Sequence, residues 1–157
     1  MIKIKLIAVG KIKEKYYQDA VSEYAKRLSR FCDLKIVEVK EENFTTNPND
    51  AEREVIKQRE GEKISKEIKG HAIALAIEGK KYSSESFAKL LSNIKDNGEE
   101  LTFIIGGSYG IDEKIKNGTH QKISVSDMTF PHTLFRVMLL EQIYRGFMIL
   151  QGAEYHK

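Results

Sequence analysis

The sequence predicts an α/β fold in a single domain over residues 1–157, with a mostly parallel sheet of about five strands and helices on both faces. Short apolar segments alternate with longer amphipathic ones, which is typical of parallel strands joined by crossover helices. The length of 157 residues suits one domain with a substantial core. Hydrophobic residues make up 41% of the chain and charged residues 31%, as in ordinary globular proteins.

The first half of the chain contains two predicted strands and two predicted helices. Apolar residues alternate over 2–9 and stop at Gly10, which predicts a strand. A helix is predicted over 14–30, because apolar side chains recur there at spacings of four, three and four residues. These side chains are Tyr17, Val21, Tyr24 and Leu28. A second strand is predicted over 34–39, and a charged helix over 51–68 follows a polar loop.

The second half continues the alternation. The continuous apolar run over 72–77 suits a strand that is buried on both faces. After a turn, a helix is predicted with an N-cap at Ser83 or Ser84 and with Gly98 just past its end. Two further strands are predicted, over 101–105 and 122–126.

A long helix is predicted to start with Pro131 in its first turn and to stop at Gly152. Twelve of the twenty residues from 131 to 150 are apolar and cover nearly the whole circumference, but three charged residues argue against a membrane span. Such a helix needs cover on two sides. Either it packs between its own sheet and the same helix of a second copy, or it is central in the core of a monomer.

Charge and cysteine content restrict the function classes only weakly. The formal net charge is +3, although the first 30 residues contain eight Lys or Arg and three acidic residues. The single cysteine, Cys32, excludes an internal disulfide and indicates a cytoplasmic protein. We predict no signal peptide and no membrane association. We also predict no metal, because the histidines at 71, 120, 132 and 156 lack metal-ligand spacing.

Three segments follow apolar strands and are predicted to converge at the carboxyl edge of the sheet, where ligands bind in α/β proteins. They are EGKKYSS after Ile77, GGSYG after Ile105 and DMTF after Ser126. The glycine loop matches neither the P-loop nor the dinucleotide fingerprint. Its glycines at 106, 107 and 110 suit either a backbone that lies against a planar group such as adenine, or a tight turn without a ligand.

The segment before the long helix and the end of the chain each allow two interpretations. Ser126, Asp127 and Thr129 can cap the helix, whereas Met128 and Phe130 either plug the core or wall a pocket. The end of the chain either frays or supplies Tyr155, His156 and Lys157 for stacking on a base and holding a phosphate. His132, in the first turn of the helix, is either a base held neutral by the helix dipole or a packing residue.

Five segments together resemble the ribosomal large subunit methyltransferase H family of the SPOUT superfamily. They are AVGKIKEKYY, IALAIEGKKYSSE, FIIGGSYG, SVSDMTFPHTLFRVMLLEQIYR and the terminal EYHK, and the resemblance runs from the first residue to the last. It implies a sheet whose C-terminal part is threaded into a trefoil knot, and a homodimer. It also implies that S-adenosylmethionine binds at Leu75, at Gly106 and along Val125 to Phe130.

The implied reaction is methylation of N3 of a pseudouridine in helix 69 of 23S rRNA, on the assembled bacterial ribosome. Arg136, Tyr155 and His156 are our candidates for orienting RNA and easing loss of the N3 proton, with His132 as a further candidate. Two alternatives stay open. One is a SPOUT methyltransferase that acts on another RNA such as tRNA, and the other is a ribosome-binding module without catalysis.

Overall fold

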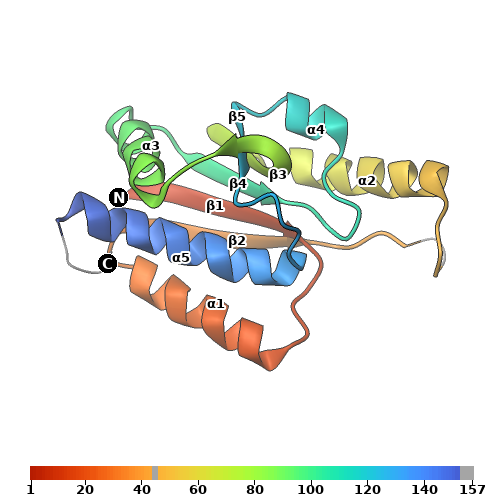
Figure 1. Ribbon diagram of the computed structural model, residues 1–157, viewed down its shortest axis with the longest axis horizontal. Helices are drawn as coiled ribbons and strands as arrows, with labels where there is room; N and C mark the ends of the chain where they lie inside the picture. Colours follow the sequence, from red (N-terminus) through yellow and green to blue (C-terminus); the bar gives the residue numbers. More distant parts are fainter. Residues whose placement is uncertain (44–45, 153–157) are drawn as a thin grey trace.

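A computed structural model, which describes residues 1–43 and 46–152, contains one five-stranded sheet between two layers of helices (Figure 1). The strand order is β2-β1-β4-β3-β5, and every strand pair in the sheet is parallel. The strands are β1 Ile2–Val9, β2 Cys32–Val39, β3 His71–Lys81, β4 Leu101–Ile105 and β5 Gln121–Ser124. The helices are α1 Lys15–Leu28, α2 Asp50–Ser65, α3 Ser84–Asp96, α4 Glu113–Asn117 and α5 His132–Leu150. The predicted α/β class and strand number are confirmed.

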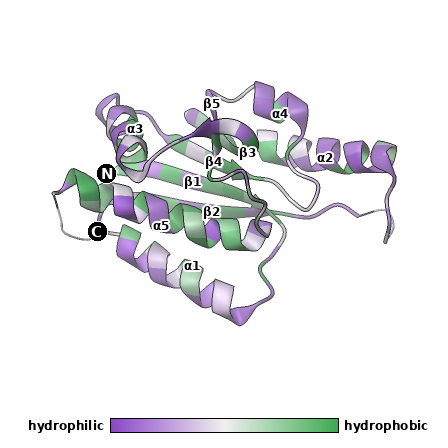
Figure 2. Ribbon diagram, in the orientation of Figure 1, coloured by the Kyte–Doolittle hydropathy of each residue, from purple (hydrophilic) through white to green (hydrophobic). Residues whose placement is uncertain are grey.

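Each face of the sheet has its own core, because side chains alternate along the strands. In β1, the even-numbered residues from Ile2 to Ala8 pack with α1, α3 and α5, whereas Ile7 and Val9 pack on the opposite face with residues of α2 and α4. Figure 2 shows why α5 and α2 differ: α5 is hydrophobic along most of its length, whereas α2 is largely hydrophilic. Accordingly, α5 buries Leu139, Leu140, Ile143, Tyr144 and Phe147, but α2 buries only two apolar side chains.

Local capping chemistry sets the helix boundaries. The side chain of Ser83 accepts a hydrogen bond from Ser86 N at 3.0 Å, which confirms a serine cap for α3. In α2, Asn49 and Glu52 form a reciprocal capping box, so this helix starts at Asp50 rather than at residue 51. Gly98 and Gly152 follow α3 and α5 in the left-handed conformation, as expected for residues after helix ends.

The structure differs from the sequence prediction at several elements. The strand β3 continues to Lys81, so most of the segment predicted as a loop after Ile77 is strand. The strand β2 begins at Cys32, two residues early, and the short helix α4 was not predicted. Pro131 is the N-cap of α5 rather than a residue of its first turn, and no side chain caps this helix.

The extension of β3 depends on a close approach to β5. Ile123 of β5 pairs with Leu75 and also with Lys80, so the register shifts by five residues along β3. Gly79 lies directly against the backbone between these two pairings: a Cβ atom there would be 2.6 Å from Lys122 C and from Ile123 N. Only glycine permits two backbones to approach so closely.

Candidate functional site

A cavity of about 570 Å³ lies at the carboxyl ends of β3, β4 and β5, where the three predicted segments meet. Its size is within the range of small-molecule sites. Residues from four segments line it: Leu75 to Glu78, Ile105 to Ile111, Ile123 to Ser126, and Met128 to His132. Lys116 of α4 and Phe135 of α5 complete the wall. The glycine loop and the segment after Ser126 therefore meet as predicted, whereas the segment predicted after Ile77 contributes only Glu78 to the wall.

The glycine loop owes its shape to contacts within the loop. Gly107 and Gly110 form an isolated antiparallel bridge, and Gly110 has a φ of 90°, which favours glycine. A Cβ atom on Gly106 would lie 2.6 Å from Gly110 C. The tight-turn interpretation thus accounts for the glycines at 106 and 110, and the same turn presents its backbone to the cavity.

The loop between β5 and α5 walls the cavity with apolar side chains. Met128 is 72% exposed, and the ring of Phe130 meets the ring of Phe135 edge-on with centroids 5.7 Å apart. Of the two interpretations for Met128 and Phe130, the pocket wall is the one that the structure supports. The polar residues of this loop do not cap α5: Ser126 Oγ accepts from Met128 N at 3.1 Å, and Asp127 pairs with Lys81 outside the cavity wall.

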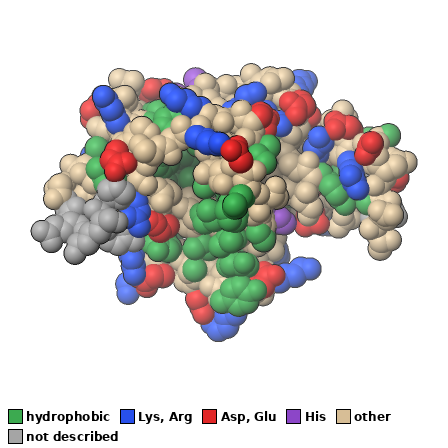
Figure 3. Space-filling view, viewed as in Figure 1, with side chains coloured by type: hydrophobic (Ala, Val, Ile, Leu, Met, Phe, Trp, Pro, Cys, Tyr) green, Lys and Arg blue, Asp and Glu red, His purple; other side chains and the backbone are tan. Residues whose placement is uncertain are grey.

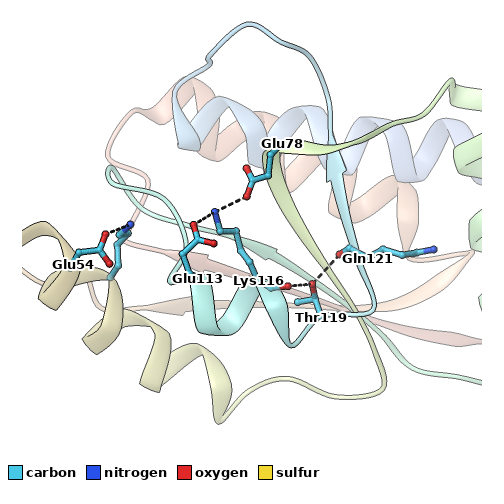
Figure 4. Close-up of polar contacts among 7 residues, drawn as sticks. Glu54, Glu78, Glu113, Lys116, Thr119 and Gln121 are labelled. Atoms are coloured by element: carbon cyan, nitrogen blue, oxygen red, sulfur yellow. Dashed lines mark hydrogen bonds and ion pairs between the residues drawn. The ribbon is translucent and has the colours of Figure 1, made fainter. Parts of the chain in front are cut away.

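An ion-pair cluster borders the cavity on the side of α4. Lys116 places its ammonium group 2.7 Å from Glu78 of β3 and 2.8 Å from Glu113 of its own helix (Figure 4). Burial lowers the pKa of Lys116, but the hydrogen bonds to Glu113 and Glu78 outweigh it and hold that pKa above its usual value. The hydrogen bond from Lys116 in turn lowers the pKa of Glu78. Both groups therefore stay charged at neutral pH, and they fix α4 against β3.

His132 is the one predicted catalytic candidate among the described residues that lines the cavity. Its side chain is half-buried, and burial, followed by the positive charge of Arg136, lowers its pKa. The neutral form that we predicted is thus favoured, but desolvation is the main cause rather than the helix dipole. A neutral imidazole in a cavity wall can accept a proton from a bound ligand.

Arg136 does not lie where a contact with RNA requires it. The side chain is 1% exposed and donates to Glu38 Oε2 and to the carbonyl oxygens of Val9 and Gly10. We predicted that Arg136 orients RNA, but the guanidinium instead joins α5 to the ends of β1 and β2. Tyr155 and His156, the other two candidates, lie outside the described residues.

Seven of the eight residues predicted to hold a cofactor line the cavity. They are Leu75, Gly106, Val125, Ser126, Met128, Thr129 and Phe130, and Asp127 is the exception. The prediction missed Tyr109, Lys116 and Phe135. Nothing in the sequence indicated Lys116, because α4 was not predicted. Tyr109 could have been found, since it lies within the glycine loop. The guanidinium of Arg53 lies over its ring.

Several other kinds of site are missing from the described part of the chain. No cluster of three or more metal-ligating side chains occurs among residues 1–43 and 46–152. No helix in the same ranges is long and apolar enough to cross a bilayer. Cys32 is buried, and burial raises the pKa of its thiol to about 12, so this cysteine is not a nucleophile.

Residues 2–156 match the family model described as "Predicted SPOUT methyltransferase". Proteins named ribosomal RNA large subunit methyltransferase H from Clostridium beijerinckii and Clostridium kluyveri are 50% and 49% identical, over 98% of this chain and 99% of theirs. The protein of that name from Streptococcus equi subsp. zooepidemicus is 47% identical, over 99% of this chain and all of its own.

Two solved structures share the fold at much lower identity. A putative methylase family protein from Neisseria gonorrhoeae superposes with a TM-score of 0.51 at 10% identity, covering 91% of this chain and 82% of its own. TrmJ from Z. mobilis ZM4 gives the same TM-score at 12% identity, over 93% and 70%. At these identities the likeness concerns the fold alone.

Proposed function

The chain belongs to the SPOUT methyltransferases and, within them, to the ribosomal RNA large subunit methyltransferase H family, and on this premise we propose its reaction. The protein transfers a methyl group from S-adenosylmethionine to N3 of a pseudouridine in helix 69 of 23S rRNA. It acts on assembled ribosomes in the cytoplasm. The observation that carries the proposal is the convergence of Leu75, Gly106 and the 125–130 loop on one cavity, because the family likeness assigns the cofactor to these residues.

The cavity suits an adenosine-containing cofactor. Leu75, Ile105 and Phe130 offer apolar surface for a purine ring, and the backbone of the glycine loop lies in the wall with its polar groups. Lys116 and Glu78 also line the cavity, where they pair with each other at 2.7 Å and hold α4 against β3. The residues present therefore fit S-adenosylmethionine.

Methyl transfer from this cofactor does not require a covalent intermediate with the protein. When bound, S-adenosylmethionine supplies a methyl group on a positively charged sulfur, which is already activated for transfer. The chain must align the nucleobase N3 with that methyl group, and alignment of this kind is worth roughly 7 kcal/mol or more. It must also remove the proton from N3, so that the nitrogen lone pair is free to form the new bond.

Within the described residues His132 has the placement for this proton transfer. Its neutral imidazole lies in the cavity wall, and the charge of the buried Arg136, one turn later, lowers its pKa. We assign His132 the role of proton acceptor and Arg136 a positioning role. Tyr155 and His156 remain candidates for orienting the RNA, in the protein's own site or in that of a partner subunit.

A trefoil knot and a homodimer form part of the same proposal. The knot is supported by the double pairing of Ile123 with Leu75 and Lys80, and by the contact of Gly79 with the β5 backbone, as expected where one segment crosses another. The dimer is supported by a second, largely apolar cavity of about 420 Å³ between β3, α3 and α5. Val137 and Met138 of α5 line that cavity and leave surface for a second copy.

A calorimetric titration with S-adenosylmethionine, followed by mass analysis of nucleosides from treated ribosomes, tests the proposal. We expect saturable binding and one new methyl group on a helix 69 pseudouridine. Thr129→Trp, which fills the cavity from an exposed loop position, abolishes binding. Absence of binding at millimolar cofactor contradicts the proposal. A substitution at Gly106 is a poor test, since a Cβ atom there clashes with the loop itself.

A further inference from the structure

The segment that leads from β1 into α1, residues 11–16, is called the rim segment; its start passes the first turns of α5, where His132 lies (Figure 1). The Nη2 atom of Arg136 donates to the carbonyl oxygens of Val9 and Gly10, which ties the start of this segment to the first turns of α5. The carboxylate of Glu14 is near enough to His132 to favour its protonated form. Residues 11–16 are therefore neighbours of the reaction site without being part of its wall.

This rim segment presents two unpaired cations and an aromatic ring to solvent. Lys11 and Lys13 are exposed, and no carboxylate among the described residues lies within ion-pair distance of either ammonium group. Tyr16 is 67% exposed, and its ring is held edge-on against Tyr17 with centroids 4.6 Å apart. Lys15 differs from the other two lysines, because it pairs with Asp19.

The segment is also held in a defined conformation. The side-chain amide of Gln18 donates to the carbonyl oxygen of Ile12 at 2.7 Å, midway between the two lysines. Gly10 N donates to Val39 O at 2.8 Å at the start of the segment. A surface that is ordered before binding loses less conformational entropy when a ligand docks on it.

We propose that Lys11, Lys13 and Tyr16 form a docking surface for the single-stranded RNA loop that carries the target base. The lysines contact phosphates on either side of that base, and the ring of Tyr16 stacks on a neighbouring base. Single-stranded RNA is recognised by this combination, in which cations follow the backbone and aromatic rings hold unstacked bases. The inference rests on the proposed function, since it names the surface that presents the substrate to the cavity.

The charge of the rim segment favours RNA as the partner. The first 30 residues contain eight Lys or Arg and three acidic residues, and Lys11, Lys13 and Lys15 belong to the rim segment. In Figure 3, hydrophobic side chains gather over the layer formed by α5 and α1, where the proposed homodimer contact lies. Bases that are splayed out of a loop supply flat apolar faces, on which the exposed ring of Tyr16 can stack.

The experiment compares Lys11→Glu/Lys13→Glu with a control, Lys66→Glu/Lys69→Glu, which makes the same charge change beyond the opposite edge of the sheet, just before β3. Methylation of 70S ribosomes that lack the modification is measured as kcat/KM over a range of KCl concentrations. For the rim variant we expect kcat/KM to fall by about tenfold or more, and the slope of log kcat/KM against log salt to flatten by about 1.4, since each phosphate contact on a single strand contributes about 0.7. The control variant keeps both values.

Tyr16→Ala and Tyr16→Phe test the stacking. We expect Tyr16→Ala to raise KM by about tenfold, and Tyr16→Phe to restore it, because the phenylalanine ring stacks as well. Calorimetry with S-adenosylmethionine must give parental affinity for every variant, which shows that the fold and the cofactor site are intact.

Two results would overturn the inference while the proposed function stands. The first is a parental kcat/KM and salt slope in Lys11→Glu/Lys13→Glu. The second is a change in molar mass by light scattering for the rim variants, which would assign the surface to a contact between copies of the chain. Failure of the parent protein to bind cofactor or to methylate ribosomes would instead contradict the proposed function.

Discussion

The guanidinium of Arg136 lies 2.7 Å from the carboxylate of Glu38, although the arginine is 1% exposed and Glu38 belongs to a strand on the far side of β1. The same group donates to two carbonyl oxygens at the end of β1. One side chain thus holds the carboxyl ends of two strands and the first turns of α5 together, one turn after His132. A buried charge with this many partners has a structural role before it has any other.

Arg136→Ala is expected to destabilise the protein by roughly 2–4 kcal/mol, because it leaves buried carbonyl groups without a donor and opens a cavity. The measurement is urea unfolding followed by circular dichroism. Glu38→Gln serves as the matched control and should cost less than about 1 kcal/mol, since the Glu38 side chain is 39% exposed and glutamine still accepts a hydrogen bond. Equal losses in the two variants would contradict the assigned role.

Gly79→Ala is expected to cost more than about 4 kcal/mol or to prevent folding, because its Cβ would lie 2.6 Å from two backbone atoms of β5. The effect should extend to the cavity, since Leu75 and Ile123 on either side of the crossing line it. Gly98→Ala is the control: it has open space around it and a φ of 71°, so it should cost only about 1 kcal/mol. Denaturation midpoints of both variants decide the matter.

How far the sequence predicts this structure depends on whether the deciding contacts are local. The core strands β1 and β4 and the helix α3 follow from apolar spacing and from the Ser83 cap, both of which are short-range features. The polar end of β3 looks like a loop because its strand conformation depends on pairing with β5, 43 residues away. The five-residue α4 is too short to show a helical period.

The candidate site shows the same division. The meeting of three segments at one sheet edge follows from parallel topology, and seven predicted cofactor residues line the resulting cavity. By contrast, the buried position of Arg136 could not be predicted, because its partners Glu38 and Val9 are about 100 residues distant or more in the sequence. The position of Lys116 in the cavity wall could not be predicted either, since it depends on where α4 packs.

Glu60→Gln is expected to stabilise the protein at neutral pH. Glu60 is 3% exposed, and burial raises the pKa of its carboxyl group even though it accepts a hydrogen bond from Glu42 N at 3.1 Å. The folded state then binds a proton more tightly than the unfolded state, so stability falls as pH rises from the unfolded pKa towards the folded one. Glutamine keeps an acceptor for Glu42 N without the buried charge.

Thermal unfolding between pH 4 and pH 8 measures this effect. The difference between Glu60→Gln and the parent should grow as pH rises and then level off above the pKa of Glu60 in the folded state. Glu62→Gln, at an exposed position on the same helix, is the control and should show no such trend. A parent that gains stability relative to Glu60→Gln with rising pH would refute the argument.

His132→Gln is expected to lower kcat for ribosome methylation by about 10²–10⁴-fold, the usual contribution of a positioned general base. The lowered pKa of His132 means that the parent enzyme carries a neutral imidazole at neutral pH. The fall of its kcat towards acid pH should therefore have its midpoint below the ordinary histidine pKa of about 6.5. Cofactor affinity by calorimetry should not change. If the variant keeps the parental kcat, His132 is not the proton acceptor, and another residue such as His156 has that role.

The same histidine gives a second readout in folding, which separates its charge from its catalytic role. Because its pKa is lower in the folded state, the unfolded chain binds the proton more readily, and stability is lost as pH falls below about 6.5. His132→Gln removes that contribution, so its unfolding midpoint should depend less on pH between 5 and 7 than that of the parent. If both proteins lose stability equally over that range, the imidazole is not desolvated in the cavity wall, and the basis for its neutral form is lost.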